Sequence, residues 1–170
     1  MNRLSSGVFG LALGCALGVG VTGCGGDDDS TAKPATPAPD IEVKGTWQSD
    51  SAEYPETDTI DDTSWSTAFS GSDPTVSKIV EYSNTERTAV VLSPDDAKYN
   101  PATYSAIVWT AVADDSFYYC TASYGCASAD QAKNGPADSS CMLSTPDDTD
   151  LDGMGCDGFP WTKLTAVTPN

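Results

Sequence analysis

The sequence contains no histidine and has few basic residues, with 8 Lys and Arg against 25 Asp and Glu, so its net charge is −17. Without histidine, no serine–histidine or cysteine–histidine pair can activate a nucleophile. An acidic surface repels phosphate backbones, so we do not expect a nucleic-acid partner. The paired acids at 61–62, 95–96 and 114–115 lie in turn-rich stretches, where Asp is favoured because it hydrogen-bonds nearby backbone groups. We therefore expect a protein that is not an enzyme.

The chain also lacks an apolar run of the length that a membrane span needs, about 20 residues. Its most apolar run, residues 7–21, follows Arg3 and resembles the apolar core of a secretory signal peptide. The run ends in Val-Thr-Gly-Cys at 21–24, which resembles the lipobox of bacterial lipoproteins. The resemblance implies that residues 1–23 are removed and that Cys24 is lipidated, which gives a stable membrane anchor. An ordinary secretory peptide cleaved near Gly23 is the alternative.

Gly25 follows the predicted lipidated cysteine. In the Gram-negative sorting pattern an aspartate at this place retains a lipoprotein in the inner membrane, so the resemblance implies a lipid-anchored protein of the bacterial outer membrane. Residues 24–40 combine adjacent acids with alternating proline and predict a disordered tether. Residues 41–170 are long enough for a single domain with a hydrophobic core.

Four of the six cysteines belong to this domain, because Cys15 lies in the signal and Cys24 carries the lipid. Four cysteines in an exported domain predict two disulfides, with three ways to connect them. Zinc is disfavoured because the chain has no histidine and no C-x-x-C. We expect nested pairs, Cys120 with Cys156 and Cys126 with Cys141.

Short segments of alternating or apolar residues, separated by turn-forming residues, predict an all-β domain. We expect a small antiparallel up-and-down barrel or sandwich of seven to eight strands, stapled by disulfides, with one short late helix. The first and last strands are natural partners, since an open meander leaves pairing edges exposed. The expected strands cover 41–48, 57–60, 64–69, 76–82, 87–92, 104–112, 117–124 and 159–167, and the helix covers 127–133.

Gly45-Thr46-Trp47 in the first expected strand resembles the G-x-W of lipocalin-type barrels. The resemblance implies that Trp47 packs at the closed end of a barrel and that a basic side chain, here Lys163, lies across its indole. The lipobox, the acidic linker and the ending G-F-P-W-T-K-L at 158–164 together resemble exported bacterial lipoproteins of uncharacterised function.

A small barrel can hold one small ligand. We therefore expect a membrane-anchored envelope lipoprotein that binds a small apolar ligand, as a lipocalin-like carrier. Five aromatic residues could line its cavity: Trp65, Tyr104, Trp109, Phe117 and Tyr119. The same aromatics at strand spacing could equally form a filled core. The alternative function is a structural or surface-display lipoprotein that contacts another envelope protein and binds no small ligand.

The stretch 148–153 reads Asp-Thr-Asp-Leu-Asp-Gly, and alternate carboxylates of this kind can converge on calcium. The twelfth position of an EF-hand loop would be Phe159 rather than an acid, which excludes that motif. The stretch also resembles a single thrombospondin type 3 repeat. Calcium is the one candidate metal, with the side chains of Asp148, Asp150, Asp152 and Asp157 and the carbonyl of Met154 as its ligands. The competing interpretation is an acidic turn held by Cys156.

Overall fold

The computed structural model of this chain describes residues 39–52, 54–136 and 140–168. The chain divides into two compact units, Met1–Pro37 and Ala38–Asn170, and every described residue belongs to the second. The predicted signal peptide, Cys24 and nearly all of the predicted tether therefore lie outside the described residues. Within the described part, the one helix is too short to cross a membrane.

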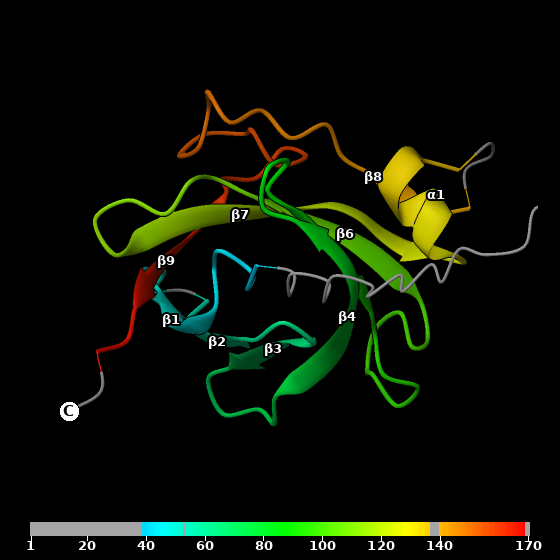
Figure 1. Cartoon of the computed structure of the whole chain (residues 1–170), viewed down its shortest axis with the longest axis horizontal. Coiled ribbons are helices and arrows are strands. Elements are labelled where there is room, and N and C mark those ends of the chain that lie inside the picture. The colour runs from blue at the N-terminus through cyan, green and yellow to red at the C-terminus, as the bar shows by residue number, and fades with distance from the viewer. Residues whose placement is uncertain (1–38, 53, 137–139, 169–170) are drawn as a thin grey trace, which may run out of the picture. The chain divides into compact units, whose positions relative to one another are not determined.

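The second unit is a closed antiparallel barrel of eight strands, as the sequence predicted (Figure 1). Strands β1 to β7 follow one another around the barrel, and β9 closes it by pairing with both β7 and β1. The elements are β1 (Gly45–Ser49), β2 (Glu56–Ile60), β3 (Ser64–Phe69), β4 (Thr75–Ser83), β5 (Thr88–Leu92), β6 (Tyr104–Trp109), β7 (Ser116–Cys126), α1 (Ala129–Asn134), β8 (Met142–Leu143) and β9 (Thr162–Ala166).

Side-chain alternation along the strands fills the barrel interior with large apolar groups. Successive strand residues point to opposite faces, so every second residue faces inward. In β1 the inward residues Trp47 and Ser49 are buried, whereas Thr46 and Gln48 are exposed. The inward residues of all eight strands form one hydrophobic cluster that includes Trp65, Trp109 and Phe117.

Outside the barrel, α1 and the two-residue strand β8 lie beside β6 and β7 (Figure 1). Ser128 caps α1 by accepting a hydrogen bond from the Gln131 N–H, and Gly135 ends the helix with a positive φ of 81°. Strand β8 was not predicted. It has only two residues and pairs with the end of β7, which is long enough to contact β9 first and β8 afterwards.

Both predicted disulfides are confirmed. Cys120 is bonded to Cys156 with their Cα atoms 5.7 Å apart, and Cys126 is bonded to Cys141 with a Cα separation of 4.5 Å. The first joins the middle of β7 to the loop before β9. The second joins the end of β7 to the chain entering β8.

The chain before β1 closes one end of the barrel. The predicted strand at 41–48 begins only at Gly45, because residues 41–44 form a turn in which Lys44 N–H donates to the Ile41 carbonyl. This turn buries Ile41 and Val43 in the barrel core. The Trp47 indole N–H donates to the Val43 carbonyl at 2.8 Å. Trp47 therefore supports the turn that closes this end of the barrel.

Side chains from two turns hold residues 39–44, which we call the plug, in place. Asp62, after β2, accepts the Ile41 N–H at 2.8 Å and pairs with Lys44 at 2.7 Å. Asn84, after β4, accepts the Glu42 N–H at 2.8 Å. These contacts come from side chains because the plug belongs to no strand.

We expect Val43→Ala to lower the free energy of unfolding by about 2 kcal/mol, since Val43 is fully buried and truncation leaves a cavity at the barrel end. Val76→Ala is the matched control because Val76 is half exposed, at 50%, and should cost less than about 0.5 kcal/mol. Urea unfolding of both variants makes the comparison. Equal effects would show that the plug does not support the barrel.

Candidate functional site

Four of the five predicted ligand-cavity residues lie together inside the barrel. The ring centroids of Trp65 and Tyr119 are 5.6 Å apart, and those of Trp65 and Trp109 are 6.4 Å apart. Phe117 makes an edge-on contact with Trp47 at 4.8 Å. The fifth residue, Tyr104, packs instead against a second cluster beneath α1. The interior aromatics therefore contact one another as a packed core, which leaves a ligand site to be sought elsewhere.

The interior also holds two carboxyl groups that the sequence analysis did not select. Glu56 and Asp58 both point inward from β2 and are 6% and 0% exposed. The Tyr119 hydroxyl donates to Glu56 at 2.7 Å, and the Thr67 hydroxyl donates to one oxygen of Asp58. The other oxygen, Oδ2, is buried and makes no regular hydrogen bond within the described residues. No ion pair of the described residues includes either acid.

Burial in this apolar setting favours the neutral form of both acids. Loss of solvation raises the pKa of Asp58 to about 7, although the Thr67 hydroxyl partly opposes the shift. Burial likewise raises the pKa of Glu56, against the hydrogen bond from Tyr119. The pKa of Tyr119 rises well above its usual value because it is buried next to these acids. Enclosed as they are, the two carboxyl groups form a polar element of the core.

The acid pairs in turns have structural roles. Asp61 accepts four hydrogen bonds from the N–H and hydroxyl groups of Thr63 and Ser64, which lowers its pKa to about 2. Asp114 and Asp115 have positive φ angles of 50° and 53° in the turn before β7, a conformation that Asp tolerates better than most residues.

Lys163 does not lie across Trp47. On β9 the fully buried Leu164 points inward, so its neighbour Lys163 points outward, where it pairs with Asp50 at 3.0 Å. This ion pair raises the pKa of Lys163. The lipocalin-like prediction for Lys163 is therefore wrong, because the position falls on the other face of the strand.

The predicted calcium ligands do not converge. No group of three acidic, cysteine or histidine side chains in the described ranges is arranged to hold a metal ion. The Asp150 side chain accepts the Met154 N–H at 2.9 Å instead. A Cβ at Gly153 would lie 2.1 Å from Asp150, and one at Gly155 would lie 2.4 Å from the Asp147 carbonyl. Asp150, Gly153 and Gly155 thus serve a tight loop, which Cys156 ties to β7.

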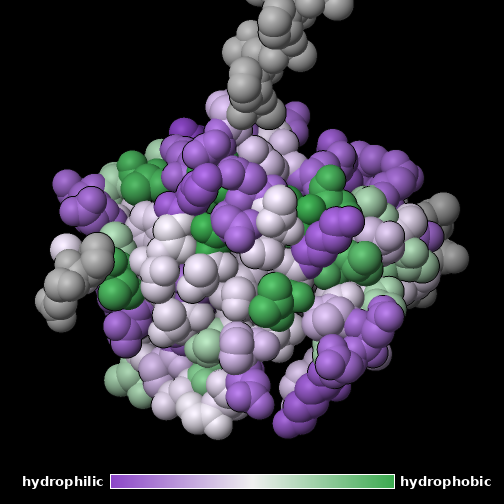
Figure 2. Space-filling model, turned by 60° about the horizontal axis from the view of Figure 1, so that its bottom comes forward, coloured by the Kyte–Doolittle hydropathy of each residue, from purple (hydrophilic) through white to green (hydrophobic). Residues whose placement is uncertain are grey.

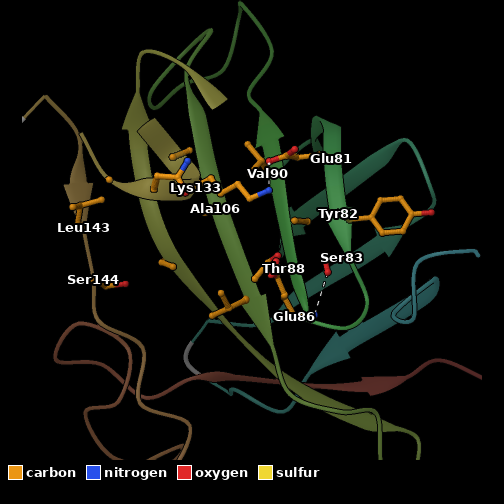
Figure 3. Close-up of a pocket in the computed structure, with 16 residues that line it drawn as sticks. Glu81, Tyr82, Ser83, Glu86, Thr88, Val90, Ala106, Lys133, Leu143 and Ser144 are labelled. Atoms are coloured by element: carbon orange, nitrogen blue, oxygen red, sulfur yellow. Dashed lines mark hydrogen bonds and ion pairs between the residues drawn. The ribbon is translucent and has the colours of Figure 1, made fainter. Parts of the chain in front are cut away.

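A groove of about 520 Å³ lies on the outer face of the barrel, between β4 and the α1–β8 segment (Figure 3). This volume lies within the range typical of small-molecule sites. Its floor crosses the outward faces of β5, β6 and β7, and its far wall comes from α1 and β8. The apolar residues that line it are Ala89, Val90, Ala106, Val108, Ala122, Ala132 and Leu143.

The groove combines an apolar floor with charged residues at its rim. Val90 and Ala106 are outward-facing residues that are nonetheless buried, at 3% and 8% exposure. They are covered because α1 packs on this part of the sheet. The face of the molecule in Figure 2 differs, since its hydrophobic residues form small separate patches among hydrophilic ones. The groove is therefore the best-formed candidate binding site among the described residues.

A signal for part of this arrangement was present in the sequence. Alternation in Glu56–Ile60 places Glu56, Asp58 and Ile60 on one face, and that face had to be inward because it includes isoleucine. The groove had no comparable signal, since it depends on where α1 and β8 pack. No family model, curated protein or solved structure matches this chain.

Proposed function

We propose that this protein is a bacterial envelope lipoprotein, anchored in the outer membrane through Cys24, whose barrel domain binds a small apolar ligand. The groove outside the barrel is the ligand site, rather than the aromatic interior. The observation that carries this proposal is its volume of about 520 Å³ over a floor of small apolar side chains. Pockets of this size and composition bury most of the surface of a small ligand.

The role is non-catalytic and involves no nucleic acid. The two carboxyl groups that are best placed to transfer protons, those of Glu56 and Asp58, are enclosed in the core where a substrate does not reach them. The acidic composition repels polyanions. The lipidated N-terminus holds the domain at the membrane, and the domain presents its groove to ligands from there.

The anchor is tested by Cys24→Ser in the full chain. We expect the substitution to abolish labelling by a fatty-acid analogue and to release the protein from the membrane fraction. The reason is that the lipid is transferred to the cysteine thiol, which serine lacks. Cys15→Ser is the matched control and should leave labelling unchanged. Labelling that persists in Cys24→Ser would overturn the anchor.

The binding role is tested on residues 38–170, which form a compact unit with an internal core and both disulfides. We expect 1-octanol to shift the amide NMR signals of groove residues saturably. Val108→Trp should fill the groove and weaken this binding at least tenfold. Trp109→Phe, inside the barrel, is the control and should leave affinity within about twofold. Shifts centred on interior residues would place the ligand inside the barrel instead.

The second candidate is a surface-display protein that contacts another envelope protein. Four exposed hydrophobic side chains favour it, each at least half exposed: Met142, Leu143, Met154 and Phe159. Strand β8, which carries the first two, pairs with β7 alone among the described strands, and its other edge could take a further strand. If no alkyl ligand binds the groove, this second function is the better one.

A further inference from the structure

The rim of the groove carries three charged side chains, and they are not balanced. Lys133, in the last turn of α1, pairs with Glu81 of β4 at 3.2 Å. Glu86, in the turn after β4, also lines the groove. Among the ion pairs of the described residues, none includes Glu86. One acid at the rim is therefore left without a cationic partner.

The positions of these charges define two ends of the groove. Glu81 and Lys133 lie at one end near Val90, whereas Glu86 lies at the other end beside Thr88 (Figure 3). The ion pair joins α1, which packs on β5 and β6, to the neighbouring strand β4. It therefore bridges one end of the groove, and the Glu86 end carries the uncompensated negative charge.

The turn that carries Glu86 is fixed from within. The Glu86 N–H donates to the Ser83 hydroxyl at 3.2 Å, which is the dashed line in Figure 3. The next residue, Arg87, contacts Glu42 of the plug at 3.4 Å and does not line the groove. Glu86 thus keeps its place at the rim, and the nearest cation in the sequence is directed to another partner.

We propose that the ligand of this groove is a cationic amphiphile, with an alkyl or other apolar body on the floor and an ammonium-type group at Glu86. This inference rests on the proposed function and adds the ligand's charge. The apolar body replaces water over Val108, Ala122 and Leu143, which line the groove and are at least partly exposed. The cationic group meets the uncompensated carboxylate, and the net charge of −17 favours it over an anionic group.

The test compares three probes with one alkyl chain and different head groups: octylammonium, 1-octanol and octanoate. With residues 38–170 at neutral pH and low salt, calorimetry should show octylammonium binding about fivefold more tightly than octanol. Octanoate should bind more weakly than octanol. High salt should reduce these differences, because an exposed charge pair is screened.

Two variants test which rim carboxylate causes the preference for octylammonium. Glu86→Gln should bring octylammonium and octanol to within about twofold of each other. Glu81→Gln frees Lys133 and should strengthen octanoate binding by about threefold. Asp73→Asn is the control for net charge, since Asp73 lies outside the groove in the β3–β4 turn, and it should leave the preference intact.

The outcomes separate this inference from the proposed function. If octanol binds the groove as tightly as octylammonium, the ligand is apolar but not cationic, and only the present inference is overturned. The same holds if Glu86→Gln leaves the preference for octylammonium unchanged. If none of the three probes binds, the proposed binding function itself is overturned.

Discussion

Asp58→Asn should make the domain more stable at pH 8, by about 2 kcal/mol, although it removes a native charged side chain. Asp58 is fully buried on β2 and its Oδ2 atom makes no regular hydrogen bond. An ionised carboxylate in this place loses its solvation without a cation to compensate. Asparagine keeps an oxygen for the Thr67 hydroxyl and never ionises, so the cost of the buried charge disappears at high pH.

The pH dependence of the unmodified protein follows from the same group. Its pKa rises from an ordinary value of 3.8 to about 7 in the folded state. Between these values the folded state keeps a proton that the unfolded state has lost, so the free energy of unfolding falls as pH rises. The slope is at most about 1.4 kcal/mol per pH unit, which amounts to about 4 kcal/mol across the interval. The raised pKa of Glu56 adds a contribution of the same sign.

The expected gain of about 2 kcal/mol is smaller than the pH-dependent change of about 4 kcal/mol. The difference arises because the asparagine NH₂ is itself left without a good hydrogen-bond partner. Urea unfolding at pH 5 and pH 8 measures the effect. At pH 5 the substitution should give no gain, since only the lower part of the interval from 3.8 to about 7 has been crossed and the unpartnered asparagine NH₂ offsets that part. A variant that is no more stable than the parent at pH 8 would contradict the account of Asp58.

Asp61→Asn is the matched control, because Asp61 lies just beyond the same strand and its pKa is shifted in the opposite direction. Hydrogen bonds from Thr63 and Ser64 lower its pKa to about 2. The stability that it contributes is therefore present above pH 3.8 and is lost as pH falls through about 2. Its replacement should destabilise the domain at pH 8.

Removal of the Cys120–Cys156 disulfide should cost about 4 kcal/mol, the largest loss that we expect from any change outside the barrel interior. The bond closes a loop with a sequence separation of 36 residues. A cross-link restricts the unfolded chain more as its loop grows, and this length corresponds to about 4 kcal/mol. The bond also fixes the loop at 144–161 to β7. The double substitution Cys120→Ala with Cys156→Ala leaves no unpaired thiol.

The second disulfide provides the comparison. Cys126 and Cys141 are separated by 15 residues, so their removal should cost about 3 kcal/mol. Removal of this second bond should also make the α1 wall of the groove less firmly packed, because Cys126 and Cys141 both pack in the cluster beneath α1. Thermal unfolding ranks the two variants, and octanol binding distinguishes them. If Cys120→Ala with Cys156→Ala weakened octanol binding more than loss of the Cys126–Cys141 bond did, this assignment of roles would be wrong.

Much of the fold could be predicted because it depends on patterns local in the sequence. Alternation identified the strands, and the count and context of the cysteines led to the nested pairing. Closure of the first and last strands followed from the cost of exposed edges, and β1 does pair with β9.

The predictions failed where the position of a side chain depends on strand register, on loop hydrogen bonds or on how separate elements pack. The sequence predicts that Lys163 lies across Trp47, but on β9 the buried Leu164 points inward, so its neighbour Lys163 points outward. The aspartates after Pro146 have the spacing of a calcium loop, but one of the four predicted ligands, Asp150, accepts the backbone N–H of Met154 instead. The groove could not be predicted, because it arises where α1 and β8 pack on outward-facing residues.

The plug has a mechanical consequence under the proposed anchoring through Cys24. Tension on the chain before Pro39 passes into residues 39–44 before it reaches β1. Those residues are held by the burial of Ile41 and Val43 and by hydrogen bonds of single side chains, such as Tyr82 to the Pro39 carbonyl and Asp62 to the Ile41 N–H. A pull at the proposed anchor would therefore act on the plug before it acts on the paired strands of the barrel.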